Sequence, residues 1–170
     1  MKKVLLFAAF AVFGLTQMNA QAVFGLTAGY LSASSKVESD GFEATGSDGG
    51  FFGGVTVDFE ISEKFHIQPE LHYASVDDVS FLRLPIFAKY YVGEKFYLSG
   101  GPSLSYTLED VLDDFTKMNI GLGLGLGYDF TEQFYIDSKA ALQLNNYYTG
   151  SEDFKSKVSF VTIGVGYKFN

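Results

Sequence analysis

The sequence predicts an all-β protein that folds as an eight-stranded antiparallel up-and-down transmembrane β-barrel. Three observations support this prediction. Apolar residues alternate with polar or small ones along most of the chain, one short turn motif occurs three times, and the aliphatic faces carry no charge in the middle of any predicted strand. A period of two is the pattern of a β-strand. An uncharged aliphatic face is what a strand needs where it contacts hydrocarbon.

The alternation is clearest in the segment "NIGLGLGLGYDF", which runs from Asn119 to Phe130. One side of it is mostly glycine, and the other side is wholly aliphatic or aromatic. A phosphate-binding loop is excluded, because its glycines are spaced G-x-G-x-x-G before a helix, whereas these alternate inside a strand. The same two-sided pattern predicts strands at 23–33, 50–61, 65–76, 80–92, 96–107, 118–130, 134–145 and 158–169.

The repeated turn motif sets the topology of these strands. It occurs as "ISEKFHI" at 61–67, "VGEKFYL" at 92–98 and "FTEQFYI" at 130–136. Each copy joins two predicted strands through a short turn. The connections at the other end, 34–49, 77–79, 108–117 and 146–157, are mostly longer and rich in Ser, Asp, Gly and Glu. Short turns at one end and longer loops at the other predict a meander, and we expect 34–49 to be a flexible acidic cap.

Aromatic residues follow the short turns, and others lie at the same level of the predicted strands. Aromatic rings are typical of the boundary between a membrane and water. The motif recurs because each return of the chain to this end meets the same boundary. We predict an aromatic girdle here, made of Phe59, Phe65, Tyr90, Phe96, Tyr128, Phe134, Tyr167 and Phe169.

The N-terminus has the pattern of a targeting segment. Basic Lys2 and Lys3 precede an apolar run from Val4 to Leu15, and a polar stretch follows. This order is typical of a secretory signal peptide, and the apolar run is too short for a membrane-spanning helix. We predict a signal peptide at 1–20, with 1–22 as the alternative because Ala20 and Ala22 fit the small-x-small rule. Residues 21–170 then form one outer-membrane barrel domain.

Composition excludes several classes of protein. The chain has 170 residues, a net charge of −8 and no cysteine. The charge and the absence of a Lys/Arg cluster argue against a nucleic-acid partner. Without cysteine there is no disulfide framework and no cysteine-ligated metal.

The identity of the inward face separates two kinds of barrel. A soluble barrel of the lipocalin kind would bury the aliphatic face around a ligand. The other face, however, combines charged residues with many glycines, as in the strand 118–130. A water-facing surface gains nothing from glycine, whereas a narrow lumen needs small residues opposite long side chains. We therefore predict that the polar face lines the lumen and that the aliphatic face contacts lipid.

Charged residues on the inward face predict a salt-bridge network in the lumen. Its predicted members are Asp58, Glu70, His72, Arg83, Lys89, Asp137 and Lys139. Pairing across the turn at 131–133 places Gly125 near Lys139 and Gly127 near Asp137. Pairing across 77–79 places Lys89 near Gln68 and Arg83 near Ala74, so that Glu70 reaches Lys89 diagonally and Arg83 lies nearer His72. A buried proton relay is the alternative interpretation, but charge neutralisation in a filled barrel is the simpler one.

Neither metal binding nor catalysis is predicted. His66 and His72 are six residues apart in sequence, about 20 Å along a strand, which is too far to share one metal ion. A membrane-barrel lipase would need a Ser and a His close together with an orienting acid. Ser75 lies three residues from His72 and therefore on the opposite face. We expect no metal, no cofactor and no enzymatic activity.

Several phrases of the sequence resemble a known family. They are "FHIQPELHYA", "LRLPIFAKYY", "FYLSGGPSLSY", "IGLGLGLGYDF" and "IGVGYKF". They are similar to the outer-membrane β-barrel domain family common in Bacteroidetes, often labelled PorT-like, over Val23 to Phe169. The resemblance implies the fold and an outer-membrane location in a Gram-negative bacterium. It also implies that the terminal aromatic Phe169, here followed by Asn170, is recognised by the outer-membrane insertion machinery.

The expected role is that of a small porin-like envelope component with a packed polar lumen, either structural or adhesive. The first alternative is a barrel that binds a small hydrophobic or envelope ligand, and the second is an outer-membrane lipid-modifying enzyme. Expected partners are membrane lipid and the insertion machinery, and we expect a monomer. Tyr147, Tyr148 and the segment 113–118 lie in the longer loops, where a contact with an unidentified partner is one interpretation and ordinary loop packing with interfacial tyrosines is the simpler one.

Overall fold

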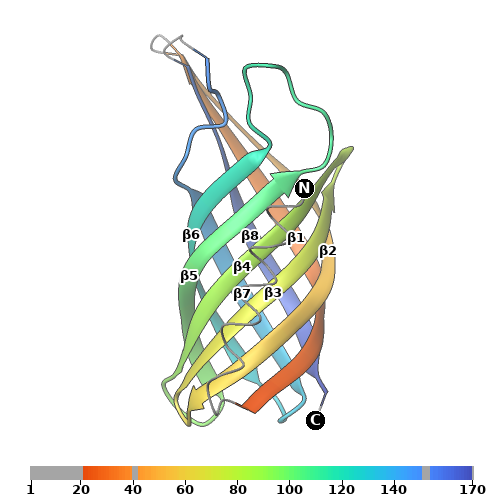
Figure 1. Ribbon diagram of the computed structural model, residues 1–170, viewed down its shortest axis with the longest axis vertical. Coiled ribbons are helices and arrows are strands. Elements are labelled where there is room, and N and C mark those ends of the chain that lie inside the picture. The colour runs from red at the N-terminus through yellow and green to blue at the C-terminus, as the bar shows by residue number, and fades with distance from the viewer. Residues whose placement is uncertain (1–20, 40–41, 151–153, 170) are drawn as a thin grey trace.

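The chain forms a closed barrel of eight antiparallel strands, in which the last strand pairs with the first (Figure 1). The computed structural model describes residues 21–39, 42–150 and 154–169. The strands are β1 (Gln21–Ser39), β2 (Phe42–Ser62), β3 (Phe65–Val76), β4 (Val79–Tyr91), β5 (Phe96–Thr107), β6 (Met118–Asp129), β7 (Phe134–Gln143) and β8 (Phe154–Lys168). The predicted fold class is confirmed, whereas the proposed signal peptide, 1–20, lies outside the described residues. No helix among the described residues is long and apolar enough to cross a membrane.

The aliphatic face of each strand points outward, as predicted. In β6, Leu122, Leu124 and Leu126 are 54%, 72% and 50% exposed, whereas the intervening Gly123 is buried. The inward face of the neighbouring strand β7 carries Asp137, which is only 4% exposed. A soluble barrel would have the reverse arrangement, so the exposed aliphatic belt is the surface that contacts lipid.

Glycines on the inward face make room for large side chains that cross the lumen. A side chain at Gly123 would overlap the ring of Phe87, and one at Gly127 would overlap the ring of Tyr97. Both rings are almost completely buried, at 2% and 1% exposure. The predicted reason for the alternating glycines is therefore confirmed: the narrow lumen holds bulky side chains only where the facing residue is small.

The three copies of the turn motif lie at one end of the barrel, where β8 also ends (Figure 1). We call this the short-turn end and the opposite one the long-loop end. The turns are closed by local hydrogen bonds. The hydroxyl of Ser62 accepts from the amide of Phe65 (3.2 Å), and that of Thr131 accepts from the amide of Phe134 (2.9 Å).

The second and third copies form the same four-residue turn, at 92–95 and 130–133, in which the amides of Val92 and Phe130 donate to the carbonyls of Phe96 and Phe134 (3.0 and 2.9 Å). The first copy turns more tightly, at 63–64, after a register shift in β2, so the sequence repeat is only in part a structural repeat.

The described parts of the predicted flexible cap, 34–39 and 42–49, are paired strand. Strands β1 and β2 continue as a paired hairpin up to Ser39 and Phe42, and β8 begins at Phe154 to pair with the same part of β1. The three strands rise past the long-loop end of the barrel (Figure 1), and we call this part the outer extension. The prediction was wrong because a polar composition does not distinguish a loop from a strand that is surrounded by water. A strand in water needs no apolar face when neighbours on both sides satisfy its backbone.

Candidate functional site in the barrel lumen

The middle of the lumen holds a network of buried charges around Glu70, which is 2% exposed. Lys139 donates from Nζ to Glu70 Oε1 (2.5 Å) and also pairs with Asp137 Oδ2 (2.7 Å). Gln68 donates from Nε2 to Glu70 Oε1 (2.6 Å), and His72 Nε2 lies 2.9 Å from Glu70 Oε2. We call these five residues the central network.

A second group of charges lies nearer the short-turn end. Lys89 donates from Nζ to Asp58 Oδ2 (3.0 Å) and to Gln68 Oε1 (2.9 Å). The other carboxylate oxygen of Asp58 lies 2.8 Å from His66 Nδ1. The ammonium of Lys89 also lies 4.2 Å from the centre of the Tyr97 ring, where an aromatic face attracts a cation. Gln68 connects this group to the central network, because its side-chain amide donates to the carboxylate of Glu70 and accepts from the ammonium of Lys89.

The structure corrects the predicted partner of Glu70. The turn between β3 and β4 consists of Asp77 and Asp78, with Val76 opposite Val79. As a result Arg83 lies opposite His72, and Lys89 lies opposite His66, two residues from the predicted register. Lys89 still reaches Gln68 but pairs with Asp58, and the cation beside Glu70 is Lys139 from β7. The pairs Gly125–Lys139 and Gly127–Asp137 are as predicted.

Arg83 differs from the other buried cations. It is 4% exposed, yet among the described residues no carboxylate oxygen lies within salt-bridge distance of its guanidinium. Its guanidinium carbon lies 4.4 Å from the centre of the Phe160 ring, so the guanidinium stacks on an aromatic face. Arg83 therefore lies between the central network and Phe160, which belongs to an apolar cluster nearer the long-loop end.

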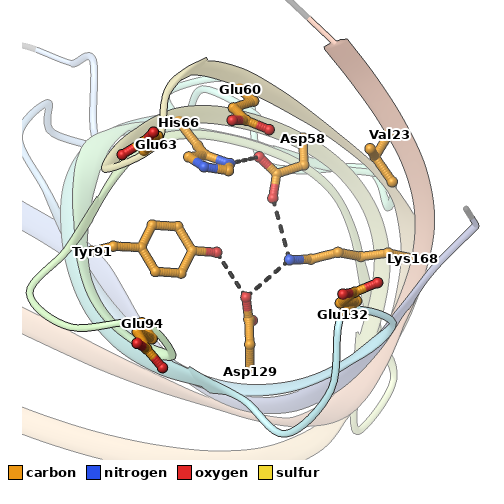
Figure 2. Close-up of a pocket in the computed structure, with 10 residues that line it drawn as sticks. All are labelled: Val23, Asp58, Glu60, Glu63, His66, Tyr91, Glu94, Asp129, Glu132 and Lys168. Atoms are coloured by element: carbon orange, nitrogen blue, oxygen red, sulfur yellow. Dashed lines mark hydrogen bonds and ion pairs between the residues drawn. The ribbon is translucent and has the colours of Figure 1, made fainter.

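The short-turn end opens into an acidic cavity of about 420 Å³ (Figure 2). The lining residues are Val23, Asp58, Glu60, Glu63, His66, Tyr91, Glu94, Asp129, Glu132 and Lys168. Figure 2 shows the ammonium of Lys168 between two carboxylates, 3.6 Å from Asp58 Oδ2 and 3.1 Å from Asp129 Oδ2. The hydroxyl of Tyr91 donates to the same Asp129 oxygen (2.8 Å). Side chains from β2, β4, β6 and β8 therefore hold this mouth together.

Several residues of the two charged groups and of the acidic cavity are not among the predicted network members. They are His66, Gln68, Tyr91, Asp129 and Lys168. The signal was available, because each has the same parity along its strand as a predicted network member. What the sequence could not supply was the contact across the lumen. Lys168 and Asp129, for example, lie on β8 and β6, which are not adjacent in the sheet.

The long-loop end holds an apolar layer and, above it, a second cavity of about 710 Å³. The layer is a buried cluster of Leu31, Phe52, Ala74, Val76, Phe81 and Phe160. The cavity is lined by Ala33, Ser35, Asp48, Val76, Asp77, Val79, Phe81, Thr107, Glu109, Asp110, Val111, Leu112, Phe115, Thr116, Tyr147, Ser156 and Val158. No residue lines both cavities, so the filled middle of the lumen separates the two mouths.

The formal charges of the lumen cancel. The carboxylates are Asp58, Glu70, Asp129 and Asp137, and the cations are Arg83, Lys89, Lys139 and Lys168. With neutral histidines, four negative groups face four positive ones. The excess negative charge of the barrel interior is therefore confined to the short-turn mouth, where Glu60, Glu63, Glu94 and Glu132 also line the cavity.

Most of the predicted girdle residues lie at the short-turn end and face outward. Phe96 is opposite Tyr128, and Phe134 packs edge-on against Tyr167 with ring centres 4.9 Å apart. Phe59 differs from the prediction, because it is only 7% exposed. It lies just before the point where the pairing of β2 with β3 shifts register, between Ala22 and Ile67 on the neighbouring strands, and offers little surface to lipid.

The two loop tyrosines differ in burial, and both contact neighbouring loop and strand residues. Tyr147 is 8% exposed, and Tyr148 packs against Phe115 and Phe154 with ring centres 5.5 and 5.1 Å apart. The carbonyl of Tyr147 accepts from the amide of Thr116 in the 108–117 loop (2.8 Å), and the amide of Tyr147 donates to the carbonyl of Ser156 in β8 (2.9 Å). These contacts hold the 108–117 loop against β8, and a surface partner stays a prediction.

The described residues contain no arrangement of a hydrolase or a metal site. His66 has Asp58 as its side-chain partner, and neither histidine is hydrogen-bonded to a serine hydroxyl within the described ranges. No three His, Asp or Glu side chains in that part of the chain are placed to hold a metal ion.

Comparison with known proteins agrees with this geometry. A family model described as "Outer membrane protein beta-barrel domain" matches residues 5–169. A search of curated proteins finds no match. The fold is similar to Neisserial surface protein A, with 21% identity, a TM-score of 0.53, and coverage of 88% of this chain and 99% of that chain.

Two further solved structures share the fold. The attachment invasion locus protein Ail of Yersinia pestis, solved with the heparin analogue sucrose octasulfate, has 19% identity and a TM-score of 0.52 over 88% of this chain and 99% of that chain. A de novo designed transmembrane β-barrel has 12% identity and a TM-score of 0.51 over 89% of this chain and 97% of that chain. At these identities the likeness concerns the architecture.

Proposed function

The chain belongs to the outer membrane protein beta-barrel domain family and is located in the Gram-negative outer membrane, and on that premise we propose that it is a non-transporting envelope protein. Its role in this proposal is structural or adhesive and does not include catalysis. The short-turn end then faces the periplasm and the long-loop end faces the cell exterior, as in other barrels of this kind.

The filled lumen is the observation that supports this proposal. Gln68, Lys89, Tyr97 and Tyr135 are each 1% exposed, and they lie where a pore would have to pass. An eight-stranded barrel encloses only enough space for its own side chains. An ion crossing this barrel would have to separate buried ion pairs, which is strongly unfavourable.

Planar-bilayer recording tests the non-transporting part. Pure protein should give little or no steady conductance, because the middle of the lumen is closed by side chains. A Lys89→Ala/Tyr97→Ala variant, which removes two of the closing side chains, should conduct more often than the wild type. Large, stable openings by the unaltered protein would reject the proposal.

The adhesive part is supported by the outer extension. Backbone pairing on both sides of β1 gives the extension a defined shape well above the barrel, with Lys36 paired to Glu38 (2.6 Å) and Glu43 (3.1 Å) on its surface. A contact surface needs a rigid support that reaches beyond the lipid headgroups. The extension rises past the long-loop end of the barrel, where such a support is needed.

Trimming the extension tests this part. Residues 35–46 would be replaced by Asn-Gly, a two-residue hairpin turn, between the paired Ser34 and Ser47. Non-adherent Gram-negative cells that display the wild type should gain autoaggregation or adherence to epithelial cells, and the trimmed barrel should not confer it at an equal outer-membrane level. Equal adherence of cells with the wild type and cells with the trimmed barrel would place the adhesive contact outside the extension. No gain in adherence with the wild type would reject the adhesive role and leave only the structural one.

The remaining features of the proposal concern assembly. The protein is a monomer whose aliphatic belt contacts membrane lipid, and the insertion machinery recognises its C-terminal strand. The neutral lumen and the acidic net charge of −8 offer nothing to a nucleic acid.

A further inference from the structure

The cavity at the long-loop end has the size of a small-molecule site. Its volume is about 710 Å³, and ligand sites in proteins span roughly 300–1,000 Å³. It lies between the outer ends of β1, β4 and β8 and the 108–117 loop that joins β5 to β6, which Figure 1 shows rising at this end of the barrel. The cavity is separate from the charged lumen, because the apolar cluster forms its floor.

The walls of the cavity are mainly apolar. Val76 and Phe81, which are 5% and 6% exposed, belong to the floor, and Val158 packs against them. Phe115 and Leu112 come from the loop, and Leu112 is 75% exposed although it is a large aliphatic residue. Covering an apolar wall that is open to water with an apolar group lowers the free energy, because both surfaces leave water.

The walls are held in place before any ligand arrives. The amide of Thr116 donates to the carbonyl of Tyr147, and the amide of Thr149 donates to the carbonyl of Asp114, both at 2.8 Å. The ring of Phe115 packs edge-on against that of Tyr148. A preformed cavity binds more tightly than one that must order its loops, because the entropy of the loops is already lost.

The charged residues that line the cavity all have the same sign. They are Asp48, Asp77, Glu109 and Asp110, and no Lys, Arg or His lines it. Lys117 donates to Asp110 (2.8 Å), and the amide of Ser80 donates to Glu109 (2.9 Å). These hydrogen bonds hold the pKa of Asp110 and of Glu109 below their ordinary values, so both carboxylates are ionised at neutral pH. Asp48 and Asp77 have no ion-pair partner among the described residues.

We propose that this cavity binds an amphiphilic cation, a small molecule with an apolar body and a single ammonium group. The apolar body lies against Phe81, Val158 and Phe115, and the ammonium lies at the rim beside Asp48 and Asp77. An anion of the same shape is repelled by the rim, and an uncharged molecule gains only the apolar contact. This binding activity goes beyond the structural or adhesive role and does not depend on it.

Three probes with one carbon skeleton test the proposal: 4-phenylbutylammonium, 4-phenylbutanol and 4-phenylbutyrate. The full barrel is held in lipid nanodiscs, and empty nanodiscs correct for partition into lipid. Isothermal titration measures affinity, and methyl NMR of valine residues reports the place of binding. The ammonium should bind more tightly than the alcohol, and the carboxylate should bind least. Shifts should centre on Val76, Val79, Val111 and Val158, which line the cavity.

Matched variants separate the rim from general surface charge. Asp48→Asn/Asp77→Asn should weaken ammonium binding several-fold, towards the affinity of the alcohol, as expected for two solvent-exposed charge pairs. Asp78→Asn/Asp113→Asn removes the same charge from residues that do not line the cavity, and should change the affinity by less than about twofold. Ala33→Trp should block all three probes by filling the cavity, while gel mobility before and after heating shows that the barrel still folds.

The proposal is overturned if the ammonium binds no better than the alcohol or the carboxylate in correctly folded wild-type protein. It is also overturned if the two double variants weaken binding equally, because general surface charge would then explain the preference. Valine shifts that are spread over the barrel, or that persist in Ala33→Trp, would show that the probe binds outside the cavity.

Discussion

Glu70 is the residue at which the buried charges of the lumen meet. Its carboxylate contacts the ammonium of Lys139, the amide of Gln68 and the ring of His72, each from a different direction. Removal of Glu70 takes from Lys139 one of its two carboxylate partners and leaves the buried amide of Gln68 without its acceptor. The cost of such a loss is high in a buried site, because the remaining groups cannot return to water.

Replacement of Glu70 should therefore destabilise the barrel. We expect Glu70→Ala to lower the free energy of unfolding by about 3 kcal/mol. Glu70→Gln keeps the hydrogen-bond acceptor and the side-chain volume, so its loss should be clearly smaller. Urea unfolding in detergent micelles, followed by gel mobility, measures both variants. Equal stability of Glu70→Ala and the wild type would mean that water reaches the central network.

A pair of adjacent glycines tests the packing of the lumen. At Gly54, on the inward face, a Cβ would overlap the backbone oxygen of Leu71 and the Cα of His72 on β3. At Gly53, on the outward face, the nearest atom is the carbonyl oxygen of Thr27 at 4.0 Å. Both glycines lie in β2, but Gly54 faces the crowded lumen and Gly53 faces open space outside the barrel.

Gly54→Ala should lower the free energy of unfolding by about 1–3 kcal/mol, because backbone on both strands must shift. Gly53→Ala should lie within about 0.5 kcal/mol of the wild type, as for other open surface sites. The same urea unfolding assay compares them. Similar losses for both variants would show that the loss of glycine itself, and not the facing strand, causes the effect.

At the scale of elements, the pairing of β1 with β8 closes the barrel. Gly25 lies opposite Lys168, and the amide of Phe169 donates to the carbonyl of Phe24 (2.7 Å). Unpaired backbone groups in hydrocarbon cost several kcal/mol each, so a membrane barrel cannot leave this junction open. Lys168 adds ion pairs to Asp58 and Asp129 inside the lumen.

Removal of 168–170 should block insertion and leave the chain aggregated or degraded in the periplasm. The truncation removes the last pair of the β1–β8 junction, the ammonium at the short-turn mouth and the terminal aromatic residue. Removal of Asn170 alone, a residue outside the described ranges, should be tolerated. Immunoblots of outer-membrane fractions compare the two truncations. A normal level of the shorter chain in that fraction would place the insertion signal elsewhere.

At the scale of the whole molecule, location follows from the aliphatic belt. Every strand crosses with its aliphatic face outward and its polar face enclosed, so the molecule is stable in lipid and exposes too much apolar surface for water. The mature chain should fractionate with the outer membrane and change its gel mobility on boiling, because the closed barrel resists detergent until it is heated. Recovery of a soluble periplasmic monomer without detergent would contradict this.

Local pattern determined much of this protein. Alternation with a period of two fixed the positions of the strands and the direction of each side chain, since that period is a property of the extended backbone itself. The short turn at 131–133 also gave the correct pairing of Gly125 with Lys139, whereas the turn at 77–79 gave a register two residues from the observed one, because its length was misjudged. Family membership also followed from the sequence, whereas the PorT-like subfamily stays a prediction.

Only the tertiary structure decided which inward residues meet. Lys139 on β7 reaches Glu70 on β3 across the lumen, although the two residues are 69 positions apart in sequence. Lys168 on β8 contacts Asp58 on β2 and Asp129 on β6, and only the closed barrel brings these three strands together. Closure, strand tilt and stagger set such contacts, and no local pattern encodes them. The same is true of the outer extension. Its strands look like a polar loop in sequence, and they become a sheet because β1 finds a partner on each side.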